Sequence, residues 1–239
     1  MAAPTAKPGT AQPWSTSDER SRLEARLPTL LSVIAGMVDL TCFLSLGNVF
    51  TAHITGNLVV IAALAVRGGP VNLAQVLVIP VFVLAVAGAW LLSRASGQRG
   101  PGLVRLLLLV QLVLLTSVLI FSVITRPSAN PHGLTAGLAA VGAVCAIACQ
   151  YVLFHVALPG GPSTGVMTNN LTNATLFLLE RFSRPSPSTA GAAAAPGNAL
   201  PLVIGFFGGC VVAAGAVSLV GDWAWSLPAS LAALALVLR

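Results

Sequence analysis

Charged side chains are scarce in this chain of 239 residues. Asp, Glu, Lys and Arg together make up 8% of the sequence, whereas hydrophobic residues make up 56%. Soluble domains carry about 25% charged residues, so this deficit excludes an ordinary soluble domain and indicates an integral membrane protein. The mean hydropathy of +0.91 is also typical of integral membrane proteins. The net charge is +6, but the arginines stand at the ends of apolar runs. That placement is typical of topology signals and not of a nucleic-acid surface.

Residue patterns of several enzyme classes are also missing. The chain has no HExxH zinc motif, no Gly-rich phosphate loop ending in Lys, and no CxxC pair. Its six acidic residues are too few and too scattered for a carboxylate dyad. We therefore predict a protein that is not an enzyme and that holds no metal and no cofactor. An intramembrane lipid-modifying enzyme is the least favoured alternative, because we identify no catalytic group for it.

Cysteine is rare too, and all four cysteines lie within apolar runs: Cys42, Cys145, Cys149 and Cys210. This placement argues against a disulfide framework. Cys145 and Cys149 are four residues apart and fall on one helix face, so a redox or metal pair is one interpretation. Small buried thiols that suit an apolar surrounding are the interpretation we favour.

The first 26 residues are rich in Pro, Ala and Thr, and we expect them to form a disordered tail. Their basic excess beside the first apolar run predicts a cytoplasmic N-terminus. We expect no cleavable signal peptide, because this tail is polar and the apolar run after it is too long for a signal-peptide core. The remainder, 27–239, should be one transmembrane domain.

Six apolar runs are long enough, or nearly so, to cross a bilayer core, which needs about 20 residues of helix. The run at 106–125 is rich in leucine, and we expect it to face lipid. Trp223 and Trp225 stand before the last run, where we expect them to anchor the membrane interface. The fold class is therefore an all-α membrane bundle with full spans at 28–47, 71–93, 106–125, 134–158, 200–220 and 225–238.

Two polar stretches, at 47–58 and 164–173, interrupt these apolar runs. Their Asn, Thr, His and Gly residues are tolerated at membrane depth only where protein or water covers them. We therefore expect each stretch to begin a re-entrant or broken half-helix inside the bundle.

The two halves of the chain repeat the same order of parts, with repeat 1 at about 28–125, repeat 2 at about 133–239 and a linker at 184–198 within the second. The residues 55–58, Thr-Gly-Asn-Leu, align with 168–171, Thr-Asn-Asn-Leu, and Asp39 aligns with Gln150. Paired interrupted helices in two repeats are the best sequence indication of a transporter-type site. Because re-entrant half-helices leave only Arg67 and Arg126 outside, the positive-inside rule favours an inverted 3+3 arrangement over a parallel 4+4 one.

Polar residues at these positions are the candidate substrate ligands. Asp39 falls near the middle of the first span, where a charge costs about 2.5–3.5 kcal/mol on insertion scales. It shares a helical stripe with Ser32 and Gly36 that should face the bundle. The carboxylate can bind a cation, a proton or a polar part of a substrate, with uncharged ligands beside it. The full candidate set is Asp39, His53, Thr55, Gly56, Asn57, Gln150, Thr168, Asn170 and Asn173.

Each of these residues also has a structural interpretation. Asp39 can hold neighbouring helices together by hydrogen bonds. His53 can relay a proton or line a turn, and His155, near a span end, can simply reach the headgroups. The Thr and Asn residues can cap the half-helices instead of binding a solute. Gly56 allows close backbone approach or an unusual backbone angle.

At these residues the chain resembles the YoaK family of bacterial inner-membrane proteins. The likeness runs from about residue 28 to the C-terminus, and one position departs from it: the family usually has Gln-Asn where this chain has Gln150-Tyr151. The resemblance implies a polytopic membrane protein of a family without a characterised activity. The segments that carry it are 35–39 (AGMVD), 47–50 (GNVF), 55–57 (TGN), Gln150 and 168–173 (TNNLTN).

The hypothesis that follows is a small-molecule or ion transporter of the bacterial inner membrane, with a site at mid-depth between the two half-helices. The alternative is a scaffold or sensor that binds a lipid or a partner protein and transports nothing. The expected partners are membrane lipids and an unidentified small molecule or ion, and no nucleic acid. A chain of 24.3 kDa is small for a carrier, so we also expect a homodimer.

Overall fold

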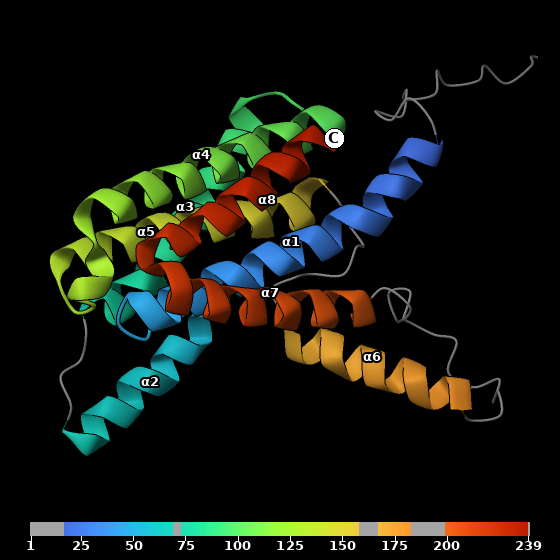
Figure 1. Cartoon of the computed structure of the whole chain (residues 1–239). Helices are drawn as coiled ribbons and strands as arrows, with labels where there is room; N and C mark the ends of the chain where they lie inside the picture. The colour runs from blue at the N-terminus through green and yellow to red at the C-terminus, as the bar shows by residue number, and fades with distance from the viewer. Residues whose placement is uncertain (1–16, 69–72, 158–166, 183–198, 239) are drawn as a thin grey trace, which may run out of the picture.

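The computed structural model describes residues 17–68, 73–157, 167–182 and 199–238, and the regular structure within these ranges is helical throughout (Figure 1). This outcome confirms the all-α prediction. The helices are α1 (Ser17–Ser45), α2 (Ile54–Arg67), α3 (Leu73–Ala95), α4 (Pro101–Thr125), α5 (Leu134–Val152), α6 (Met167–Phe182), α7 (Ala199–Val220) and α8 (Ser226–Val237), with short turns of helix η1 (Pro127–Ala129), η2 (Leu153–Ala157) and η4 (Gly221–Trp225).

Five described segments are long and apolar enough to cross a membrane. The first four are parts of α1, α3, α4 and α5 with its extension η2. The fifth runs from Ala199 to Val237 and includes both α7 and α8. The 14-residue helix α2 is apolar but shorter. The predicted disordered tail, residues 1–26, is wrong for residues 17–26, because α1 already begins at Ser17. Residues 1–16 and the predicted linker at 184–198 lie outside the described residues.

Helices α1 and α7 lie side by side and run in the same direction, in contact through glycine. Gly205 lies against Thr29 and Val33, and Gly209 lies one turn further along, against Val33 and Met37. Small residues spaced four apart let two membrane helices approach until their backbones touch. This contact places the polar stripe of α1 in the bundle, as predicted: the Ser32 hydroxyl donates to the Leu202 carbonyl over 2.6 Å.

Helix α5 packs between α3 and α4 along a face of small residues. Gly137 lies against Ala74 on α3, and further along both helices the rings of Phe82 and Tyr151 meet at 5.4 Å, so α3 and α5 run in parallel. Helix α4 runs antiparallel to α5. The alanines on this face of α5 are buried, and they are Ala136, Ala139, Ala140, Ala143 and Ala146.

Helices α2 and α6 diverge from this bundle. Figure 1 shows them pointing toward opposite ends of α7, with their amino-terminal turns nearest each other. Helix α6 packs along α7, and α2 packs against the start of α3. Two short helices therefore follow the polar stretches, but they lie beside the bundle and not inside it as predicted.

Two expectations for single segments are wrong. Helix α4 does not simply face lipid, because one side of it packs against α5 and α8 and buries Leu107, Leu108 and Leu115 completely. Trp225 does not turn its ring outward as an interface anchor would; it is fully buried, whereas Trp223 is 60% exposed. In both cases, the long-range packing that covers the residues leaves no signal in the local pattern.

Candidate functional site

The carboxylate of Asp39 is the centre of a compact polar cluster. Its Oδ1 accepts hydrogen bonds from the backbone N–H groups of Thr51 and Ala52, over 2.6 and 2.8 Å, and a longer one of 3.3 Å from the Thr51 hydroxyl. Its Oδ2 accepts a 2.7 Å hydrogen bond from Nδ1 of His53. These four donors replace the water that the charge loses on burial, since hydrogen bonds to charged groups contribute about 1.5–3 kcal/mol each.

These contacts fix the path of the loop between α1 and α2. Asp39 lies six residues before the end of α1, which is about 9 Å along the helix axis. Because Thr51 and Ala52 bind its carboxylate, the chain returns from the end of α1 to the depth of Asp39 before α2 begins. Gly47 and Asn48 form the reversal with positive φ angles of 77° and 60°. Such angles suit Gly, and Asn tolerates them better than most residues.

His53 connects this cluster to α7. Its ring meets the ring of Phe206 edge-on, with 5.1 Å between centroids, and the side chain remains 38% exposed. The hydrogen bond to Asp39 raises the pKa of His53, although partial burial works in the opposite direction. Protonated His53 and Asp39 therefore form an ion pair whose histidine can still exchange a proton.

Asn57 joins the loop to the first turn of α2, where its Nδ2 also donates to the Ile54 carbonyl over 3.1 Å. Its side chain accepts from the Phe50 N–H over 2.9 Å and donates to the Phe50 carbonyl over 2.8 Å, and it is completely buried. Gly56 provides the space beside it, since an added Cβ would lie 3.2 Å from the Phe50 ring. The close-approach interpretation of Gly56 is the one that applies, because its φ is not positive. Thr55 is exposed on the other side of α2.

Gln150 lies in a neighbouring network that joins three helices. Its Oε1 accepts a 2.9 Å hydrogen bond from Nε2 of Gln111 on α4, and its own Nε2 donates over 3.0 Å to the carbonyl of Leu31 on α1. Gln150 is buried, but it contacts a different part of α1 from the Asp39 cluster. Its observed contacts hold helices together.

Tyr151 belongs to the site although the sequence patterns do not single it out. Its hydroxyl donates a 2.6 Å hydrogen bond to the carbonyl of Ala52, the residue whose N–H binds Asp39. Tyr151, in the second half of the chain, thus holds the α1–α2 loop of the first half. It is also the position at which the sequence departs from the YoaK pattern. The sequence does carry one indication of this contact. A buried tyrosine hydroxyl usually forms a hydrogen bond, so a tyrosine within an apolar helix predicts a polar partner on a neighbouring segment.

The second polar stretch contributes less to the described cluster. Thr168 is exposed in the first turn of α6, Asn170 is buried at 3% exposure, and Asn173 is partly buried. Residues 158–166, which begin this stretch, lie outside the described ranges. They include Gly161-x-Ser163-x-Gly165, which has the spacing of the nucleophile motif of many hydrolases. In hydrolases this pattern follows a strand, whereas here η2 precedes it and α6 follows it.

Asp39 and His53 are the ion-pairing side chains of this cluster. Within the described ranges, no three His, Cys, Asp or Glu side chains gather as metal ligands. Three buried polar atoms in the last turns of α1 and the start of α3 have no hydrogen-bond partner in the described structure. Buried polar atoms normally have one, so these mark places where water or a solute can bind; they are Thr41 Oγ1, Ser45 Oγ and Gln75 Oε1.

An all-α bundle with several apolar, span-length helices and a buried polar cluster is the architecture of a membrane protein. The chain belongs to the family described as "Protein of unknown function (DUF1275)", which matches residues 27–238. No curated protein and no solved structure matches the chain. The family agrees with the expected membrane-protein family of uncharacterised activity, and the YoaK name remains a resemblance.

Proposed function

We propose that this protein is a multi-pass transport protein of the bacterial inner membrane, in which the Asp39–His53 pair is the proton-linked element. The observation that carries the proposal is this ion pair, held by a loop that turns back into an apolar bundle. Ionisable residues within membrane bundles are costly, and they mark proton relays and solute pathways.

The contacts between helix ends support six crossings in two inverted halves. Gln75, at the start of α3, donates to the carbonyl of Gly47, just after α1, so α2 adds no net crossing. Leu202, at the start of α7, contacts Ser32, and Gln150, near the end of α5, contacts Leu31. The chain therefore leaves α5 and enters α7 at the same end of the bundle. Six alternating spans place the N-terminus and the basic α3–α4 loop on one side, which the positive-inside rule assigns to the cytoplasm.

The proposed solute site lies beside α7, where α2 and α6 begin. His53 and Phe206 border it on the α7 side. We propose that α6, which packs along α7 and buries Asn170 in its first turn, supplies the other side. Half-helix N-termini that face a shared region are the arrangement by which transporters bind polar or anionic groups. In this proposal Asn57 and Gln150 shape the surroundings and do not bind the solute.

Proton binding to His53 then controls the loop. While His53 is protonated, its pair with Asp39 holds the beginning of α2 against α7. When the proton leaves, the attraction between charges is lost, and the loop is held by the neutral hydrogen bonds that remain. A solute that binds one of these two states more tightly shifts the equilibrium toward it, which couples its movement to that of a proton.

Reconstituted vesicles test this function. Pyranine inside the vesicles reports proton movement when small amino acids, sugars and organic acids are added in turn under a pH gradient. We expect at least one solute class to accelerate proton flux in the wild type and not in Asp39→Asn. Asp222→Asn is the matched control, because this acid binds Ser128 in a loop contact outside the cluster. The proposal would be contradicted if the wild-type protein inserts correctly but none of the solute classes changes its proton flux.

One observation favours the scaffold or sensor alternative. All the described donors to Asp39 come from the α1–α2 loop, and both carboxylate oxygens accept hydrogen bonds from it. A carboxylate with a purely structural role needs such a full set of partners. In that case Asp39→Asn would impair insertion or assembly. The vesicle experiment separates the two functions, because a transporter predicts an Asp39→Asn protein that inserts normally and lacks flux.

A further inference from the structure

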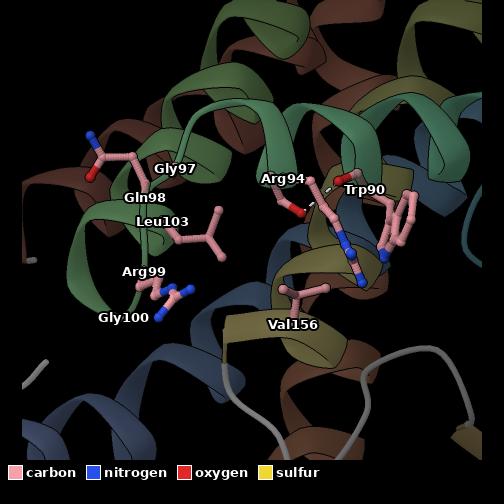
Figure 2. Close-up of a pocket in the computed structure, with 9 residues that line it drawn as sticks. Trp90, Arg94, Gly97, Gln98, Arg99, Gly100, Leu103 and Val156 are labelled. Atoms are coloured by element: carbon pink, nitrogen blue, oxygen red, sulfur yellow. Dashed lines mark hydrogen bonds between the residues drawn. The ribbon is translucent and has the colours of Figure 1, made fainter. Parts of the chain in front are cut away.

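A second polar site lies at the other end of the bundle, where α3 turns into α4. The turn and the end of η2 enclose a cavity of about 520 Å³. Figure 2 shows the Arg94 side chain running past the ring of Trp90 toward Val156, with Arg99 on the loop opposite. The lining residues are Trp90, Ser93, Arg94, Gly97, Gln98, Arg99, Gly100, Leu103 and Val156.

No described carboxylate compensates the charges of this cavity. Among the side chains that the structure describes, neither Arg94 nor Arg99 forms an ion pair with a carboxylate. The Arg94 guanidinium lies 4.5 Å from the centre of the Trp90 ring, a cation–π contact that orients the group. Because guanidinium groups bind phosphate through a planar fork of N–H donors, two of them at one hollow are suited to a phosphate group.

The other side of the cavity is apolar. Leu103 is buried, Val156 is partly buried, and Trp90 continues onto an exposed face of α3 that includes Leu91 at 59% exposure. A free phosphate ion gains nothing from such a surface, whereas the acyl chains of a lipid do. Tryptophan next to arginine at a span end also marks the headgroup level of a membrane.

We propose that this cavity binds the phosphate headgroup of an anionic phospholipid, with Arg94 and Arg99 on the phosphate and the acyl chains along α3. Basic pockets between membrane helices on the cytoplasmic side bind anionic headgroups in this way. The glycines of the turn support the shape, because Gly97 and Gly100 have φ angles of 62° and 53° that other residues rarely adopt. This site is separate from the Asp39 cluster and does not depend on transport.

Native mass spectrometry of the delipidated full chain tests the proposal. Phosphatidylglycerol, phosphatidylcholine and inorganic phosphate are titrated in separate arms. We expect one phosphatidylglycerol to be retained at least about tenfold more strongly than phosphatidylcholine. Arg94→Gln/Arg99→Gln should remove this preference and leave phosphatidylcholine binding unchanged. Arg105→Gln is the control for charge: it removes one positive charge, against two in the double variant, from an exposed position near the same loop but outside the cavity.

Three results would overturn the assignment. The first is equal retention of the two lipids by the wild type. The second is loss of the preference in Arg105→Gln as large as that in the double variant, which would indicate a general charge effect. The third is arginine-dependent binding of inorganic phosphate without a preference between the lipids, which would make this a site for a soluble anion. Gel filtration checks that each variant is folded.

Discussion

At the scale of single residues, Asp39 and Tyr151 hold the same short segment from opposite sides. Asp39 binds the N–H groups of Thr51 and Ala52, while Tyr151 binds the carbonyl of Ala52. Phe50, next in the chain, is fixed by Asn57 in the same two-sided way. These side chains therefore satisfy backbone groups of Phe50, Thr51 and Ala52 without solvent, as irregular backbone within a membrane requires.

His53 should make stability depend on pH. Its hydrogen bond to Asp39 raises its pKa in the folded state, so the folded protein holds this proton more tightly than the unfolded chain does. The stabilisation is complete below the unfolded pKa of about 6.5 and is lost as pH rises through the raised folded value. We expect the Tm of the wild type to fall from pH 6 to pH 9 by more than that of His53→Gln. Identical slopes for the two proteins would show that this pair contributes no such linkage.

Removing the Tyr151 hydroxyl isolates the contact between the two halves of the chain. Tyr151→Phe keeps the ring and its contact with Phe82, but it leaves the Ala52 carbonyl without this donor. We expect a loss of about 0.5–1.5 kcal/mol in the free energy of unfolding, measured by denaturant titration in detergent. Phe82→Leu, which removes the ring contact and keeps the hydroxyl, should leave the loop contact intact. A Tyr151→Phe protein as stable as the wild type would mean that the hydroxyl has an equivalent partner.

At the scale of helices, the close contact of α1 with α7 positions the polar cluster against Phe206. It depends on three glycines on facing surfaces, Gly36 on α1 and Gly205 and Gly209 on α7. An added Cβ at Gly36 would collide with the Phe206 carbonyl, and one at Gly209 would collide with the Val33 carbonyl. The backbones of the two helices touch at these points.

Gly209→Val should therefore force the two helices apart, with a cost of about 1–3 kcal/mol or more, as for overpacking in a core. The matched control is Gly208→Val, because a Cβ at Gly208 meets nothing within 4 Å. Thermal unfolding in detergent, followed by gel filtration, measures the difference. Equal effects of the two substitutions would show that helix propensity matters here and the α1–α7 contact does not.

The sequence predicts helices better than it predicts their neighbours. Apolar runs near the length of a bilayer define most of the elements, and the stripe of Ser32, Gly36 and Asp39 predicts which face of α1 is buried. The burial of Trp225 and of one side of α4 could not be predicted, because it depends on which distant helix covers them. The same holds for the cavity at Arg94, since the residues around it predict only a Gly-rich basic loop.

At the scale of the whole molecule, the two halves do not contribute equivalent residues to the site. The sequence predicts a set of ligands at matching positions of the two repeats, and the structure does not show that symmetry. Asp39, His53, Gly56 and Asn57 form or support one cluster, as local spacing predicts. Gln150 aligns with Asp39 in sequence, but its described contacts belong to a helix-bridging network. Alignment of two halves does not determine which side chains meet, because three-dimensional neighbours in a bundle come from packing angles that the sequence pattern does not encode.

The proposed six crossings make a direct topological prediction. Single cysteines at Arg94 and Arg126, in a background lacking the four native cysteines, should label from opposite sides of the membrane. Position 94 should react from the cytoplasm and position 126 from outside, while position 67 should react on the same side as 126. Labelling of position 94 from outside would contradict the inverted 3+3 arrangement.

The most direct test is whether the Asp39–His53 pair controls the position of α2. Spin labels at the exposed positions Leu58 on α2 and Val211 on α7 report this distance by double electron–electron resonance in lipid nanodiscs. In the wild type we expect a narrow distribution at pH 6 and a broader or shifted one as the pH is raised toward 9 and His53 loses its proton. In Asp39→Asn we expect the broader or shifted distribution at both pH values. A single narrow distance in both proteins at both pH values would contradict a proton-linked loop.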